Sequence, residues 1–145
     1  MFTVDEIRVH IQDFPEKNFL LDEEEFSDEQ LEMGIRAAIS GFNSIPPVHL
    51  QINTRNMTQA LKDIMLEGVL AHVYRGKSLQ HFRNQLNFQD GGAAGSIDDK
   101  GQFYQGLASQ MQSNFENRVA NFKRFQNMDD GFGELSSDYS GLSMY

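Results

Sequence analysis

Residues 57–86 read MTQALKDIMLEGVLAHVYRGKSLQHFRNQL, and this stretch decides the fold. Apolar and small side chains recur in it every three or four residues, the spacing of one face of an α-helix. The residues at this spacing are Met57, Leu61, Ile64, Met65, Gly68, Val69, His72, Val73, Gly76, Leu79, Phe82 and Leu86. The sequence therefore predicts a long helix whose middle is buried on most sides. Its small residues Gly68, Ala71 and Gly76 are expected to let neighbouring helices approach closely.

A second long helix is predicted over about residues 98–127. The apolar residues that recur in it at helical spacing are Phe103, Leu107, Met111, Phe115, Val119, Phe122 and Phe125. Asp129, Asp130 and Gly131 are expected to close it. The glycine-rich segment between the two helices, NFQDGGAAGSI at 87–97, has no apolar period and is expected to be a surface loop. The two helices then form an α-hairpin.

Two shorter helices precede the hairpin, and each begins with a capping box and a hydrophobic staple. The capping boxes are Thr3 with Glu6 and Ser27 with Gln30, and the staples are Phe2 with Ile7 and Phe26 with Leu31. Pro15 is expected to stop the first helix, and Gly41 with Pro46-Pro47 the second. Residues 48–56 alternate apolar and polar side chains, but no partner strand is evident, so an extended connection is expected.

These elements predict an all-α fold, a helical bundle with a long central α-hairpin and an extended C-terminal arm. Residues 1–130 form the bundle domain and residues 131–145 the arm. The arm lacks helical periodicity and is rich in Gly and Ser, but it still carries several large apolar side chains. These are the candidate partner-binding residues Phe132, Leu135, Tyr139, Leu142, Met144 and Tyr145. A frayed terminus is the alternative.

The chain has 145 residues and a formal net charge of −9, which is distributed unevenly. Residues 1–32 hold 11 acids and two bases, residues 33–128 hold ten bases and six acids, and residues 129–145 hold four acids and no base. This asymmetry suggests contact between copies or with a charged partner, although a solvated acidic face is the simpler alternative. The bases Arg75, Lys77, Arg83, Arg118, Lys123 and Arg124 complement the dipoles of the two long helices or receive the acidic segment of a neighbouring subunit.

We expect no catalytic, cofactor-binding or metal site, and no enzymatic activity. The chain has no cysteine, which excludes disulfides, zinc-thiolate sites and thiol nucleophiles. None of the four histidines (His10, His49, His72, His81) has metal-site spacing; His72 is expected in the interior or an interface, and His81 on the surface. Asp63 and Glu67 share a helix face, but two solvated acids are the simpler interpretation. The glycine-rich segment matches no phosphate-binding motif. No apolar run approaches a membrane span.

The long hairpin also carries a resemblance. The runs EGVLAHVYRGKSLQHFRNQLNFQDGG and SIDDKGQFYQGLASQMQSNFENRVANFKRFQNM resemble small neck proteins of tailed bacteriophages. In that set a helix of the type LLxGAxAHLxRSxAL leads through a glycine loop to DDKxxxYxxLAxxLxxxFExxVxxxK. The upstream FNSIPP after an acidic helix also looks like the set. The resemblance covers roughly residues 25–128.

This resemblance implies a head-to-tail connector, also called an adaptor, which forms a ring of commonly twelve copies beneath the portal protein. The expected partners are other copies of the chain, the portal, further neck or tail proteins, and double-stranded DNA that passes without specific binding. The expected location is the virion neck, and the host cytoplasm during assembly. The acids Asp22, Glu23, Glu24 and Glu25 are candidates for lining the channel or for contacts between subunits. The alternatives are another neck or tail-completion protein, or an acidic regulatory module that mimics DNA.

Overall fold

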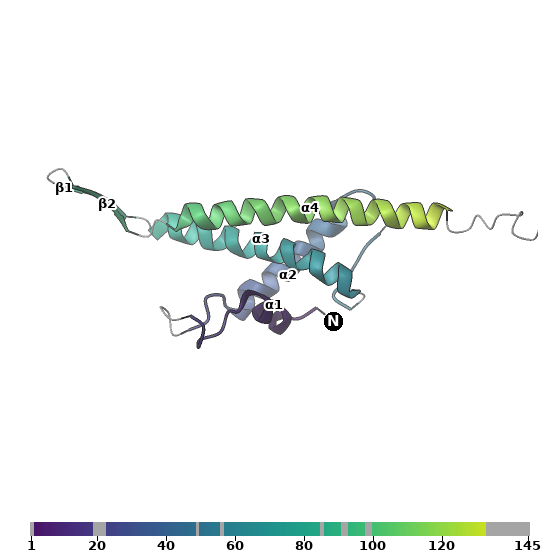
Figure 1. The fold of residues 1–145 in the computed structure, drawn as a ribbon, viewed down its shortest axis with the longest axis horizontal. Helices are drawn as coiled ribbons and strands as arrows, with labels where there is room; N and C mark the ends of the chain where they lie inside the picture. Colours follow the sequence, from purple (N-terminus) through teal and green to yellow (C-terminus); the bar gives the residue numbers. More distant parts are fainter. Residues whose placement is uncertain are drawn as a thin grey trace, which may run out of the picture.

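The computed structural model describes residues 2–18, 23–48, 50–55, 57–84, 86–90, 93–97 and 100–132, with backbone only for 86–90, 93–97 and 129–132. Its helices are α1 (Val4–Ile11), α2 (Asp28–Ser44), α3 (Gln59–Asn84) and α4 (Gly101–Phe132). The long helices α3 and α4 lie side by side and antiparallel, α2 packs across α3, and α1 packs on α2 (Figure 1). The predicted all-α fold is confirmed.

Glycines set the close approach of α2, α3 and α4. A Cβ on Gly68 would lie 2.8 Å from the Phe115 ring and 3.0 Å from Ala38, so both neighbouring helices meet α3 at this residue. A Cβ on Gly34 of α2 would lie 2.9 Å from Val69. The prediction for Gly68 is therefore correct. That for Gly76 is wrong, because nothing lies within 4 Å of a Cβ placed there.

The core is one cluster shared by all four helices. Its buried members are Phe2, Ile7, Phe26, Leu31, Ile35, Ala38, Phe42, Leu61, Ile64, Met65, Val69, Val73, Phe115 and Val119. The two capping boxes form as predicted at Thr3 and Ser27. The two staple pairs are buried in this cluster, which explains how a helix of eight residues, too short to be stable alone, is held in place.

The segment between the long helices differs from the prediction. Strands β1 (Leu86–Asp90) and β2 (Ala93–Ile97) pair antiparallel, with Leu86 opposite Ile97 and Asp90 opposite Ala93, in place of the expected loop. This hairpin projects from one end of the α3–α4 pair (Figure 1). In β1, Leu86 and Phe88 alternate with polar residues, but β2 (AAGSI) carries no alternating apolar signal, so the pairing of the two strands is not evident from the sequence.

Helix α4 begins and ends later than predicted. It runs to Phe132, so Asp129, Asp130 and Gly131 do not close it, and Phe132 belongs to the helix rather than to the arm. A glycine costs an exposed helix only about 1 kcal/mol, which does not by itself stop it. The other predicted arm residues (Leu135, Tyr139, Leu142, Met144 and Tyr145) lie outside the described residues. Over the part of the chain that the structure describes, no helix is long and apolar enough to cross a membrane.

Candidate functional site

Arg8 is the centre of a buried ionic cluster between α1 and the start of α2. Its guanidinium lies 3.1 Å from Asp13, 2.8 Å from Glu24 and 2.7 Å from Asp28, and it donates a 2.8 Å hydrogen bond to the carbonyl of Phe26. The side chains of Arg8 and Asp13 are only 6% and 3% exposed. Three carboxylates therefore surround one buried cation, which is the condition under which burying a charge is tolerated.

Asp13 extends this cluster into the acidic segment before α2. Its carboxylate accepts hydrogen bonds from the backbone N–H groups of Glu25 (2.6 Å) and Phe26 (3.0 Å), and from the Asn18 side chain (2.7 Å). Asn18 also donates to the Glu23 carbonyl at 2.8 Å. The acidic segment between α1 and α2 is thus folded back against α1.

Glu25 joins the same segment to the α3–α4 pair. The hydroxyl of Tyr104 donates to Glu25, and Lys77 lies 3.8 Å from the same carboxylate. The ring of Tyr104 stacks on His81, with centroids 5.2 Å apart. Burial, with a smaller contribution from the charge of Glu25, raises the pKa of Tyr74 beside them. The base Lys77 therefore meets the acidic segment of its own chain.

Of the four acids predicted to line a channel or a subunit contact, two are paired within the chain. Glu24 binds Arg8, and Glu25 binds Tyr104 and Lys77. Glu23 is exposed, and Asp22 lies outside the described residues. The structure thus brings Glu24 and Glu25 into stabilising contacts and leaves Glu23 at the surface.

Lys123 is a second buried cation, and it has carbonyl partners instead of carboxylates. Its ammonium donates to the backbone carbonyls of Phe42 (2.7 Å), Ile45 (2.5 Å) and Pro47 (3.2 Å), and lies 4.6 Å from the centre of the Phe42 ring. The residue is 0% exposed, and burial lowers the pKa of its ammonium group. Lys123 therefore binds the C-terminal end of α2 to α4.

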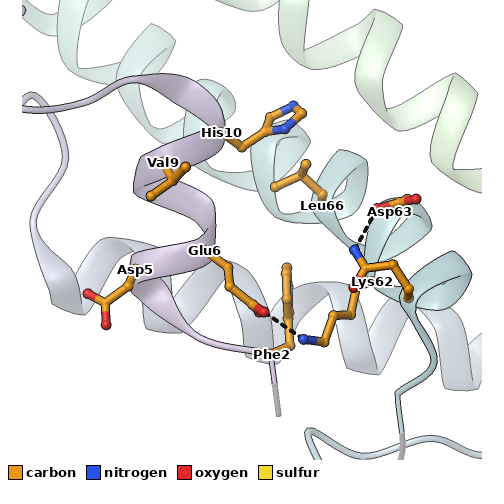
Figure 2. Close-up of a pocket in the computed structure, with 9 residues that line it drawn as sticks. Phe2, Asp5, Glu6, Val9, His10, Lys62, Asp63 and Leu66 are labelled. Carbon is orange, nitrogen blue, oxygen red and sulfur yellow. Dashed lines mark hydrogen bonds and ion pairs between the residues drawn. The ribbon is translucent and has the colours of Figure 1, made fainter.

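An apolar groove of about 410 Å³ lies between α1 and the first turns of α3. Figure 2 shows Phe2 and Leu66 inside it, Val9 at its edge, and the ion pair of Glu6 with Lys62 (2.6 Å) across it. The hydrogen bond from Lys62 holds the pKa of Glu6 below its ordinary value. The groove combines an apolar interior with charged edges, which suits an apolar anchor flanked by charge.

Large apolar side chains are exposed at both ends of the α3–α4 pair. Leu79, Phe82 and Phe103 lie near the β-hairpin, and Phe125 and Met128 near the far end of α4. Phe103 and Phe125 were expected on the same helix face as Phe115, but only Phe115 is buried. These exposed groups are candidates for contacts with other molecules.

The acidic side chains that were considered as candidates for catalysis or metal binding do not lie together in a site. Asp63 accepts a hydrogen bond from Gln59 (3.3 Å), whereas Glu67 pairs with Arg118 (2.9 Å). Among the described residues, no group of three or more His, Asp or Glu side chains has the geometry of a metal site.

The structure differs from the histidine predictions at two positions. His72 is exposed at the rim of a second groove between α2 and α3, so its predicted place in the interior is wrong, whereas a place in an interface stays a prediction. His81 is half-buried against Tyr104 because α4 packs over it, and so it is not a simple surface residue. His10 lines the groove beside α1, and His49 lies outside the described residues.

The roles of Arg8 and Lys123 were missed from the sequence. Lys123 does have a signal, since Phe115, Val119 and Lys123 recur every four residues and therefore share one buried face. Arg8 has none, because its partners come from a segment without regular period. Comparison of the chain with protein-family models, with curated proteins and with solved structures gives no match.

Proposed function

We propose that this chain is a structural, non-catalytic protein of the virion neck of a tailed bacteriophage, a head-to-tail connector that forms a ring beneath the portal. The resemblance over residues 25–128 carries the proposal, and these residues correspond to α2, α3 and α4 with their connections. The exposed apolar side chains at both ends of the α3–α4 pair support it. A chain built to contact other proteins has a reason to keep such groups on its surface.

The physical basis of such a ring is burial of surface between identical copies. A head-to-tail contact closes into a ring when the rotation between neighbours divides a full turn evenly. The resemblance implies twelve copies. DNA would pass through the channel without specific binding, because exposed acids such as Glu23 and Glu29 repel phosphate groups.

Negative-stain imaging of the purified protein, alone and mixed with the portal protein of the same phage, tests this function. Rings that appear on the portal are expected. An acidic DNA mimic would instead act as a monomer or dimer and occupy the basic groove of a partner. No ring on the portal, together with absence of the protein from assembled particles, would contradict the proposal.

The C-terminal arm is proposed to order on the portal or on a neighbouring subunit. Removing residues 133–145 should leave helicity and the melting temperature unchanged, because all the buried core residues identified above precede them. The same truncation should abolish binding to the portal in a pull-down. The matched control replaces these residues with a Gly/Ser segment of equal length, which should also fail to bind. Unchanged binding by the truncated chain would rule out the arm's role.

A further inference from the structure

One end of the α3–α4 pair carries an exposed aromatic side chain, Phe125, which together with Arg124 we term the knob. Arg118 of α4 is opposite Glu67 of α3, with their charged groups 2.9 Å apart. Because the helices are antiparallel, advancing from Arg118 to Phe125 corresponds to moving back along α3 to about Ala60, at its first turn. Phe125 is 71% exposed and lies where α3 begins, so α3 offers it no covering turn.

The knob is basic on one side. Arg124 is exposed beside Phe125, and Met128, one turn further along α4, is also exposed. Lys123, the preceding residue, is fully buried and holds this part of α4 against the end of α2. The knob is therefore an aromatic side chain with a flanking positive charge on a helix that is anchored two residues away, at Lys123.

The groove between α1 and α3 has the complementary character. Its interior is apolar, with Phe2 and Leu66 inside and Val9 61% exposed at its edge. The exposed carboxylate of Asp5 lies on its α1 side, and that of Asp63 lies on the opposite, α3 side (Figure 2). An apolar anchor beside a cation fits this combination.

The knob and the groove also lie at the same level along the α3–α4 pair. The α3 residues that line the groove run from Gln59 to Leu66, and Phe125 is level with the first of them. In Figure 1, α1 and α4 lie on opposite sides of α3. Two surfaces at one level but on different sides of a molecule meet when copies stand side by side and are related by rotation about an axis parallel to the long helices.

We propose that Phe125 of one copy inserts into the α1–α3 groove of a second copy, with Arg124 facing Asp63 of that copy. The contact is heterologous, since the knob and the groove are different surfaces. It leaves each copy with one free knob or groove, so further copies can add. In the ring of the proposed function, on which this last point rests, it is a contact between neighbouring subunits.

The other exposed aromatic of α4 supplies a matched control. Phe103 is 64% exposed on the same helix, but its chain neighbours are Gln102 and Tyr104, so it lacks the flanking cation. It also lies at the opposite end of α4, at the level of Ser78, which donates to the carbonyl of Gly101. Phe103 therefore shares the chemistry of the knob without its position or charge.

Cysteine crosslinking between single-cysteine variants tests the contact directly, because the chain has no cysteine of its own. A mixture of V9C and F125C chains should form mixed disulfide dimers under mild oxidation, faster than a mixture of V9C and F103C. Single-cysteine chains cannot crosslink within themselves, so every product reports on contact between copies. Equal rates for the two mixtures, or no V9C–F125C product at the highest soluble concentration, would overturn the proposal.

A charge exchange tests the electrostatic part. Phe125→Ala and Arg124→Glu should each weaken self-association at least about tenfold in sedimentation experiments, the size typical of an interface anchor. Phe103→Ala should leave it within about twofold. Combining Arg124→Glu with Asp63→Lys should restore association that neither single variant shows. Failure of this rescue would contradict the assigned pairing of Arg124.

These results separate the contact from the proposed function. Rings on the portal without preferential V9C–F125C crosslinking would refute the contact and leave the neck function standing. Preferential crosslinking without rings on the portal, and without the protein in assembled particles, would establish the contact and refute the neck function.

Discussion

Two buried cations hold this protein together in different ways. Arg8 lies between α1 and α2 with three carboxylates within 3.1 Å, and its partner Asp13 also accepts two backbone N–H groups. Lys123 joins α4 to the end of α2 and donates only to three carbonyls. The first site is therefore an ionic network, whereas the second is a cap on a helix C-terminus.

The difference follows from the partners that each location offers. The N-terminal part of the chain is rich in acids, so a planar guanidinium can bind several carboxylates at once. The end of α2 presents carbonyl groups that lack helical partners, and a compact ammonium at the negative end of the helix dipole satisfies them. Removing a partner should accordingly cost more in the first region than in the second.

The largest effect is expected from Asp13→Ala. This change leaves the guanidinium of Arg8 without its buried partner and orphans the N–H groups of Glu25 and Phe26, at a cost of about 3–5 kcal/mol. Urea unfolding measures it. Asp28→Asn is the control, because the Asp28 side chain is 73% exposed and its ion pair should contribute less than about 1 kcal/mol. Equal losses in the two variants would show that the cluster does not act as a buried network.

A smaller effect is expected from Lys123→Met, about 1–3 kcal/mol in urea unfolding. The apolar stem is retained, the carbonyl of Phe42 keeps its hydrogen bond from the N–H of Ile45, and the carbonyls of Ile45 and Pro47 are only partly buried. The neighbouring exposed residue supplies the control, since Arg124→Met should change stability by no more than about 0.5 kcal/mol. A loss larger than that of Asp13→Ala would reverse the ranking of the two regions.

The smallest effect is expected from Glu6→Gln at the exposed pair with Lys62, below about 1 kcal/mol at neutral pH. The pKa of Glu6 is lowered in the folded state from an ordinary value of 4.5, so its contribution is present above that pH and is lost as the pH falls through the folded-state value. The difference in urea midpoint between the wild type and Glu6→Gln should therefore shrink in acid and in high salt. A difference that grows in acid would give the opposite sign and exclude this ion pair as its source.

The sequence predicted the helices well because their signals are local. Both capping boxes lie within a few residues of the helix that they start, and the apolar period identifies most of the buried residues of α3 as far as Val73. The β-hairpin was missed because the residues of β2 (AAGSI) show no alternating apolar pattern that would identify a partner for β1. The end of α4 was placed too early because Gly131 was interpreted as a stop.

The sequence by itself thus determined where the four helices lie and which face of each is apolar, since capping and periodicity depend only on neighbours along the chain. Only the tertiary structure decided which of the apolar side chains that recur along α4 are buried. Phe115 is buried because Gly68 of α3 and Gly41 of α2 lie against its ring, while Phe125 is exposed because α3 begins at that level. It also decided that Arg8 and Lys123 are interior cations, because their partners other than Asp13 are distant in the chain and become adjacent only when the chain folds.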